Sequence, residues 1–359
     1  MSAPTRSLAP VTNALRLPGR ALLGQGPAIQ LPRAWFADDT LFVTHAEGVG
    51  GVLHGALTQH SAQPPFAVVS RRTLGASTAL SAFVQAALAP THAALVYVDI
   101  TQGARAARIA FFDRSATDAG RRARSDVRLG PAPSTYPAVA YNPRLGEFGV
   151  VWSHDVDLHF SRFSADGSSI AGSAITLPNL EFTWSNGTRF VSTRDGWGAL
   201  VRETHSANHK IVAFNAHNDV SAQPTILSQH GSPIESSLSW DGERFALAWS
   251  SNNGFFVMLQ GDGRTEAVRI ASREHYAGAP SLVFDGTNHV LVWGDNPGHS
   301  RVHIARINRS GALLSNVLFA SHPTEHCYFA FVSVGGANNT VVVTYQVGQN
   351  SAYVAELTQ

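Results

Sequence analysis

Short apolar runs recur along the whole chain, and each is followed by a segment in which apolar and polar residues alternate. The clearest copies are PSLVFDGTNHVLVWGDN, from Pro280, and SSLSWDGERFALAWSSN, from Ser236. Both predict a strand, an Asp-Gly turn and a second strand. Each continues into an alternating third strand with a second glycine turn, at 310–311 and 262–263, and a third copy spans 137–170. Each copy therefore predicts a four-stranded antiparallel meander.

The apolar second strand of this meander can be found seven times. The runs are LFVTH at 41–45, ALVYVD at 94–99, GVVWSH at 149–154, GALVRE at 198–203, FALAWS at 245–250, VLVWGD at 290–295 and TVVVTY at 340–345. Their spacing of about 45 to 55 residues is typical of propeller blades. Nearly continuous apolar runs indicate strands that are covered on both faces. The pattern predicts an all-β chain, folded as one domain of seven stacked four-stranded blades.

The predicted blades divide the whole chain into one ring. Their approximate bounds are 27–72, 73–130, 131–178, 179–228, 229–273, 274–321 and 322–359, the last completed by 14–24. The last copy ends after three strands, whereas the segment before Pro27 contains an orphan apolar stretch, ALRLPGRALL. We expect residues 14–24 to supply the missing outer strand, which closes the ring and removes an open sheet edge.

By repeat length, strand order and turn placement, the whole chain resembles a bacterial seven-bladed β-propeller. It lacks the GH and WD dipeptides of WD40 repeats, the double glycines of kelch repeats and the full Asp boxes of sialidase-type propellers. The resemblance therefore brings no catalytic residues with it. Propellers of this kind include lectins, scaffolds, lyases and hydrolases, so the fold leaves the function open.

Composition and charge limit the partners of the chain. The 26 basic and 25 acidic residues give a formal net charge of +1, which provides no general attraction to nucleic acid. No apolar run reaches the ~18 residues of a membrane-spanning helix. Cys327 is the only cysteine, so no internal disulfide can form. We expect a soluble monomer without a membrane span, whose cellular compartment the sequence leaves open because a signal peptide could have been removed.

Histidine is the residue type whose placement points to a site. Eleven of the 16 histidines fall in or beside loops that lead from second to third strands or into inner strands, and in a propeller these loops share one face. They are His45, His54, His154, His159, His205, His209, His230, His275, His299, His322 and His326. We call this predicted surface the histidine face. It can be a mere collection of polar loop residues, a ligand-binding mouth without metal, or a metal or catalytic cluster.

Equivalent positions after the second strands define the predicted site more closely. The candidate ligand-binding residues are His45, Asp99, His154, Asp155, Glu203, His205, Asp295 and His299. Imidazole and carboxylate groups together suit zinc, manganese, iron or copper. The candidate metal ligands are His45, His154, His205 and His326, with Asp155 or Glu203 orienting them.

Two neighbouring blade entrances also suggest a catalytic acid and base. The segments EHYAGAP and TEHCYF place glutamate, histidine and tyrosine together, with His275, Tyr276 and His326 as the candidate catalytic residues. A histidine base with a tyrosine acid is suited to β-elimination from uronic-acid sugars. The alternative is that such aromatic residues, together with Trp152, Trp249 and Trp293, pack between the blades.

Three functions remain open from the sequence. The first is a recognition propeller with one composite site for a glycan, peptide or protein partner at the mouth of the central channel. This is favoured because the hydrophobic scaffold repeats whereas the loops differ from blade to blade. The second is a metal-dependent lyase or hydrolase that uses the mouth histidines, and the third is an interaction scaffold.

Overall fold

The computed structural model of this chain consists of β-strands joined by tight turns. The described residues are 21–25, 30–37, 40–49, 52–61, 68–73, 84–99, 105–114, 125–183, 187–206, 208–222, 235–251, 254–260, 267–271, 280–294, 301–321, 327–335, 340–347 and 351–357. They contain no helix, in agreement with the prediction of an all-β fold. Within these ranges, no helical segment has the length and apolarity that a bilayer crossing requires.

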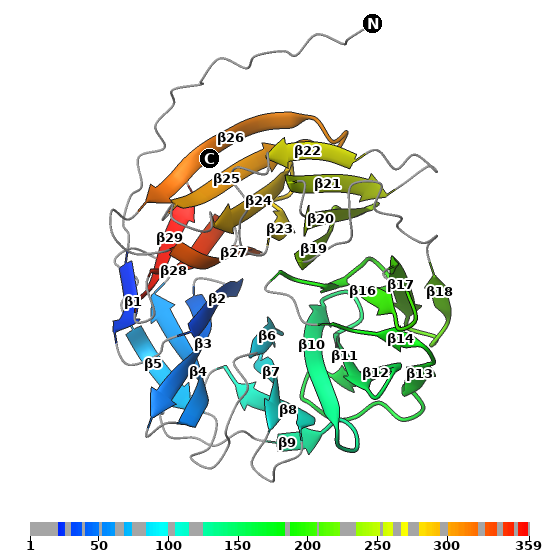
Figure 1. Cartoon of the computed structure of the whole chain (residues 1–359). Helices are drawn as coiled ribbons and strands as arrows, with labels where there is room; N and C mark the ends of the chain where they lie inside the picture. Colours follow the sequence, from blue (N-terminus) through cyan, green and yellow to red (C-terminus); the bar gives the residue numbers. More distant parts are fainter. Residues whose placement is uncertain are drawn as a thin grey trace, which may run out of the picture.

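The described strands form seven antiparallel sheets arranged around a common axis (Figure 1). From the axis outwards, blade one contains β2 (Gln30–Ala37), β3 (Thr40–Val49), β4 (Val52–Ser61) and β5 (Val68–Thr73). Blade two contains β6 (Gln85–Leu88), β7 (His92–Asp99), β8 (Ala106–Asp113) and β9 (Ser125–Arg128). Blade three contains β10 (Ser134–Asn142), β11 (Glu147–His154), β12 (Asp157–Ser164) and β13 (Ile175–Leu177). Blade four contains β14 (Leu180–Glu181) and β15 (Phe190–Ser192), which both pair with β16 (Gly196–Glu203), and then β17 (His209–Asn215) and β18 (Val220–Ala222).

The remaining three sheets follow the same order. Blade five contains β19 (Glu235–Trp240), β20 (Phe245–Ser251), β21 (Gly254–Gln260) and β22 (Ala267–Ala271), blade six contains β23 (Ser281–Phe284), β24 (His289–Gly294), β25 (Arg301–Ile307) and β26 (Leu313–Ser321), and blade seven contains β27 (Cys327–Gly335), β28 (Thr340–Val347), β29 (Ser351–Leu357) and β1 (Ala21–Gln25). The seven predicted apolar runs coincide with the strands in second position, which are β3, β7, β11, β16, β20, β24 and β28. The predicted propeller of four-stranded antiparallel blades is therefore confirmed.

The ring is closed by a strand from the start of the chain. β1 pairs antiparallel with β29, with Ala21 opposite Val354 and Gln25 opposite Ser351. The blade thus joins three C-terminal strands to one N-terminal strand, and β1 covers an edge of β29 that would otherwise be unpaired. The predicted closing strand at 14–24 overlaps β1, and its first part, 14–20, lies outside the described residues.

The hydrophobic core lies between neighbouring blades. Phe111 of blade two packs against Phe148 of blade three, with ring centroids 5.6 Å apart. Phe160 of blade three packs in the same way against Trp197 of blade four, also at 5.6 Å. Each second strand is buried on both faces because both of its neighbours contribute side chains to these layers, and this explains its nearly continuous apolar sequence.

The tryptophans of the second strands belong to these layers. Trp152, Trp249 and Trp293 are all buried, which confirms that they pack between blades. Trp152 stacks on His159 at 5.4 Å, and Trp293 stacks on His303 at 5.3 Å. In both blades the two stacked residues are direct cross-strand partners, so the same Trp–His pair occurs in blades three and six.

The turns between first and second strands are stabilised by their own side chains. Asp241 and Asp285 each accept hydrogen bonds at Oδ1 from the backbone N–H groups two and three residues later, at 2.9 and 2.7 Å. The glycine after each aspartate has a positive φ, of 99° and 97°, which the tight turn requires. Asn142 accepts equivalent bonds and also donates from Nδ2 to the carbonyls of Thr193 and Gly196 in the next blade. The predicted Asp-Gly turns are thus confirmed, and one of the related turns links two blades.

Candidate functional site

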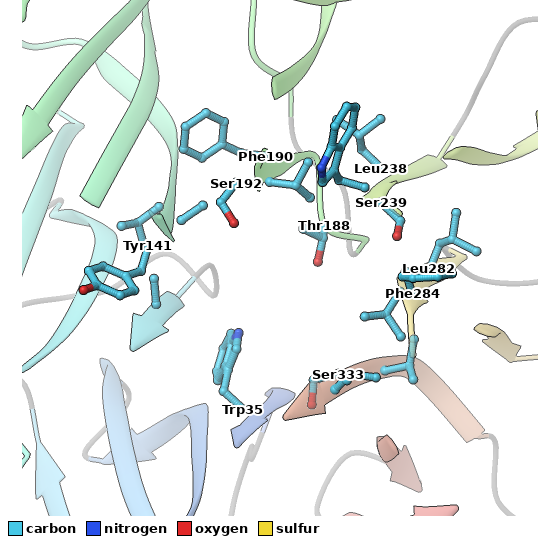
Figure 2. Close-up of a pocket in the computed structure, with 18 of the residues that line it drawn as sticks. Trp35, Tyr141, Thr188, Phe190, Ser192, Leu238, Ser239, Leu282, Phe284 and Ser333 are labelled. Atoms are coloured by element: carbon cyan, nitrogen blue, oxygen red, sulfur yellow. The ribbon is translucent and has the colours of Figure 1, made fainter. Parts of the chain in front are cut away.

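A cavity of about 360 Å³ lies on the axis, where the inner strands of all seven blades approach their ends. Figure 2 shows ten of its lining residues around an open centre: Trp35, Tyr141, Thr188, Phe190, Ser192, Leu238, Ser239, Leu282, Phe284 and Ser333. We call this space the channel cavity. It lies beside the turns between first and second strands, and therefore at the opposite end of the axis from the predicted histidine face.

Two aromatic side chains on one side of the channel cavity are supported by a second ring. Trp35 of β2 packs against Phe331 of β27, with centroids 5.7 Å apart, and the guanidinium of Arg33 lies 5.2 Å from the same Phe331 ring. Tyr141 of β10 packs against Phe148 of β11 at 5.0 Å. Partial burial raises the pKa of Tyr141, so its phenol is neutral at physiological pH. These contacts hold both rings in place before any ligand enters.

The other side of the channel cavity has the same construction. Trp240, the last residue of β19, packs against Phe245 at 4.7 Å. Phe284, the last residue of β23, lies between the imidazole of His289, at 5.1 Å, and the guanidinium of Arg309, at 4.8 Å. These aromatic residues are therefore held in fixed positions at the ends of the inner strands, and Tyr141 and Trp240 also pack against the layers between blades.

The polar groups of the channel cavity are hydroxyls and ring donors without charge. Within the described part of the chain, the hydroxyls of Thr188, Ser192, Ser239 and Ser333 make no hydrogen bond to another protein group. No side chain that carries a charge is among the described residues that line the cavity. Its wall therefore combines aromatic faces with unsatisfied neutral donors and acceptors.

A segment of blade four beside the cavity contacts the next two blades. The inner strand of this blade is interrupted between β14 and β15, and there the carbonyl of Thr188 accepts a hydrogen bond from the backbone N–H of Leu238 in blade five. A Cβ added at Gly187 would overlap the carbonyl oxygens of Ser236 and Pro280, so only glycine fits this approach. Thr188 lines the cavity, so these contacts hold one of its polar residues in place.

Two arginines are buried and lie near the charge of Glu235 in blade five. Burial lowers the pKa of both Arg33 and Arg189 to about 10, and the charge of Glu235 partly opposes that effect in each case. Both guanidinium groups therefore remain charged at neutral pH. Arg189 donates from Nη1 to the hydroxyl and carbonyl of Thr183. Neither arginine is among the residues that line the cavity.

A buried histidine lies behind Phe284. His289 is completely buried, with its Nε2 3.9 Å from Oδ2 of Asp241, and neither ring nitrogen has a hydrogen-bond partner among the described residues. Burial lowers the pKa of His289 to about 4, although the negative charge of Asp241 opposes the change. Burial alone would raise the pKa of Asp241, but the backbone N–H groups of Arg244 and Glu243 bring it below its usual value. His289 is therefore uncharged at physiological pH, and its ring packs against Phe284.

On the histidine face, the structure brings together two imidazoles of blade three. His154 lies with Nδ1 2.8 Å from the carbonyl oxygen of Pro133 and with Nε2 3.6 Å from Oδ2 of Asp155. The rings of His154 and His159 are 5.9 Å apart. Burial, and secondly the charge of His154, lowers the pKa of His159. This arrangement is confined to one blade and its own turn.

The other described residues of the predicted site also have local partners. Glu203 accepts hydrogen bonds from Lys210, at 3.0 Å, and from the turn that follows β16. The bond from Lys210 is the main cause of the lowered pKa of Glu203. His205 is exposed on that turn. Asp99 lies 3.8 Å from Nη1 of Arg108. These carboxylates therefore take part in ion pairs within their own blades.

The predicted metal site has only partial structural coverage. Among the described residues, no group of three or more histidine, cysteine, aspartate or glutamate side chains could hold a metal ion. The side chain of His45 and all of Asp295, His299, His275, Tyr276 and His326 lie outside the described residues. Their roles in ligand binding, metal binding or catalysis stay predictions.

Sequence reasoning missed the aromatic rim of the channel cavity, although a signal for it was present. In three blades an aromatic residue comes directly before the aspartate or asparagine of the first turn, as Tyr141, Trp240 and Phe284. This position is the end of an inner strand, so a repeated aromatic residue there predicts aromatic side chains beside the cavity end of the axis. The tryptophans of the second strands drew attention instead, and they pack between blades.

No protein family and no curated protein matches this sequence. Solved structures do match over nearly the whole chain. The β-propeller domain of the Trilobed protease from Pyrococcus furiosus, which has an open velcro topology, is 10% identical over 94% of this chain and 97% of that one, with a TM-score of 0.57. The Dos1 propeller is 11% identical over 88% and 74%, with a TM-score of 0.54. The polysaccharide lyase Uly1 is 10% identical over 93% and 90%, with a TM-score of 0.52. At these identities the similarity establishes the fold alone.

Proposed function

We propose that this protein is a recognition propeller that binds its ligand in one composite site, the channel cavity. The observation that carries the proposal is the convergence of seven different inner strands on one cavity whose aromatic walls are fixed before binding. Each blade contributes different side chains, so the cavity provides a single asymmetric site. Its volume lies near the lower end of the ~300 to 1,000 Å³ that is typical of ligand pockets.

The position of the cavity supports this proposal over a site on the histidine face. The rim residues Tyr141, Trp240 and Phe284 lie on strands, where the register of the sheet fixes them, and each is backed by another side chain. Rigid aromatic anchors with neighbouring unsatisfied hydroxyls are typical of binding sites in which few side chains must be ordered when the ligand binds. On the histidine face, by contrast, His154, Glu203 and Asp99 have partners within their own blades.

The similar folds are compatible with recognition as well as with catalysis. They include propeller domains of peptidases, a polysaccharide lyase and a chain of the mitotic checkpoint complex. A metal-dependent lyase or hydrolase remains the alternative, and it depends on His45, His154, His205 and His326 converging on one ion. No observation among the described residues favours that alternative over binding.

The proposal is tested by blocking the cavity. Ser192 is the last residue of β15 and faces the open centre, so Ser192→Phe should fill part of the space. Wild-type protein and this variant are compared on glycan and peptide arrays. The matched control is Ser221→Phe, which places the same side chain on the exposed outer strand β18. We expect at least one ligand that wild type and the control retain and that Ser192→Phe loses.

Two results would contradict the proposal. One is a set of ligands bound equally by all three proteins, because the site would then lie elsewhere on the surface. The other is the absence of any binder for the folded wild type on both arrays, because a preorganised cavity of this size should retain some ligand. Circular dichroism and thermal unfolding of each variant establish that the ring is intact.

A further inference from the structure

The chemistry of the channel cavity identifies the class of ligand more closely. Its wall includes the aromatic residues Trp35, Tyr141, Trp240 and Phe284, together with hydroxyls that have no hydrogen-bond partner among the described residues. We infer, on the basis of the proposed function, that the cavity binds an uncharged sugar unit at the end of a glycan. This follows from three properties of the wall, which are its lack of charge, its unsatisfied polar groups and its geometry.

The lack of charge excludes ionic ligand groups from the cavity. No charged side chain is among its described lining residues, and the buried Arg33 and Arg189 do not line it. A carboxylate, a phosphate or a peptide terminus would lose its hydration on entry without gaining an opposite charge in contact with it. An acidic sugar is disfavoured for the same reason.

The unsatisfied polar groups exclude a purely apolar occupant. The hydroxyls of Thr188, Ser192 and Ser239 can each donate and accept one or more hydrogen bonds. A leucine or phenylalanine side chain in the cavity would strip these groups of water and leave them unpaired, at a cost for each. A sugar unit carries several hydroxyls in different directions and can pair with all three.

The geometry suits a ring that has one apolar face and a polar edge. Figure 2 shows Trp35 projecting from below into the space between Ser192, Thr188 and Ser333. The face of an aromatic ring carries partial negative charge, and the C–H groups on one face of a sugar carry partial positive charge, so the two surfaces attract each other. A sugar stacked on Trp35 would direct its hydroxyls outwards, towards the serine and threonine side chains.

The size of the cavity suits one sugar unit. Its volume of about 360 Å³ is small for a ligand pocket, so the remainder of a longer glycan would extend out of it. The cavity lies beside the first-to-second-strand turns. The inference is therefore a terminal, uncharged sugar that enters from the side of these turns.

The experiment uses matched sugars and conservative variants. Binding of the methyl glycosides of glucose, galactose, mannose and N-acetylglucosamine to the full chain is measured by tryptophan fluorescence and by calorimetry, beside methyl glucuronide and methyl galacturonide. We expect at least one neutral glycoside to bind, with its uronate counterpart at least about tenfold weaker because the carboxylate loses hydration. Ser239→Ala should weaken binding of that glycoside by about five- to tenfold through a lost hydrogen bond, whereas Ser221→Ala on the outer strand should leave it unchanged.

The possible failures separate this inference from the proposed function. If Ser192→Phe abolishes binding of a peptide and no neutral glycoside binds, the channel cavity is the site and the sugar class is wrong. Equal or tighter binding of the uronates would also overturn the inference, because the arginines would then reach the ligand. If a neutral glycoside binds but Ser192→Phe and Ser239→Ala do not affect it, the cavity is not its site and both proposals fail.

Discussion

The two ends of the channel are made by the same seven blades, yet they use side chains in different ways. At the cavity end, functional candidates such as Trp240 and Phe284 are strand residues, and each is packed against a second ring or a guanidinium. On the histidine face, Glu203 pairs with Lys210, and His154 lies against the carbonyl of Pro133. Both sets of residues lie at strand ends, but Trp240 and Phe284 end inner strands, whereas His154 and Glu203 end second strands and have partners within their own blades. Convergence on the axis is therefore better predicted from the ends of inner strands than from the ends of second strands.

The largest change in stability is expected where Gly187 packs against blades five and six. Gly187→Ala places a Cβ against the carbonyl oxygens of Ser236 and Pro280, so the segment must move away from blades five and six. We expect the free energy of unfolding to fall by about 3 kcal/mol, as for other overpacked sites. Urea unfolding measures this loss. The variant should also lose any ligand of the cavity, because Thr188 moves with its neighbour.

Gly242→Ala is the matched control for this loss. Gly242 has a φ of 99°, but a Cβ there would meet nothing within 4 Å. Its substitution should cost only the backbone strain, about 1 kcal/mol, without affecting ligand binding. If the two variants are equally stable, the segment at Gly187 is not packed against blades five and six.

Low pH should lower the free energy of unfolding because the buried His289 is held neutral in the folded protein. The pKa of His289 is about 4 in the folded state and ordinarily about 6.5, because burial outweighs the attraction of Asp241, and the charges of Arg244, Arg309 and Asp285 act on it less strongly. The unfolded chain therefore binds the proton more readily, and stability falls as pH decreases from about 6.5 to about 4. We expect His289→Leu to remove about 2 to 3 kcal/mol of this pH-dependent loss, as measured by urea unfolding across that range.

His217 provides the comparison on the exposed surface. It lies in the turn after β17 and is exposed, so His217→Leu removes an imidazole without changing a buried group. The pH dependence of this variant should follow that of the wild type. A wild-type stability that is as flat as that of His289→Leu between pH 7 and pH 4 would show that His289 is not held neutral by burial.

Much of the fold was accessible from the sequence because its signals are local and repeated. The apolar runs beginning at Leu41, Ala94 and Gly149 predict second strands, and the structure places all of them in second position. The Asp-Gly turns follow from the backbone needs of a tight turn, and β1 lies where an unpaired sheet edge required a strand. Each of these features depends on neighbours in one blade or on the closure of the ring.

The candidate site was less accessible because it depends on contacts between distant segments. The sequence before Phe190 does not predict that the inner strand of blade four is divided into β14 and β15. It also does not predict that Gly187 contacts blades five and six. The sequence placed Glu203 in the predicted ligand set, but the structure shows it bonded to Lys210. The number of histidines directed the prediction to the loops, whereas aromatic residues before the first turns of three blades indicated the ends of the inner strands.

The smallest expected effect is on ligand affinity, in a variant that distinguishes the cavity end of the axis from the histidine face. His154→Ala combined with His205→Ala changes the histidine face only, since His154 contacts Pro133 and His205 is exposed on its turn. If the channel cavity is the site, this double variant should bind the cavity ligand with wild-type affinity. The residues that contact the ligand would then lie at the other end of the axis from the two substituted histidines. Calorimetry with the ligand lost by Ser192→Phe measures this. A large loss of affinity in the double variant, together with loss of about one equivalent of bound zinc, manganese, iron or copper, would move the site to the histidine face, since only a ligand held by those imidazoles would depend on them.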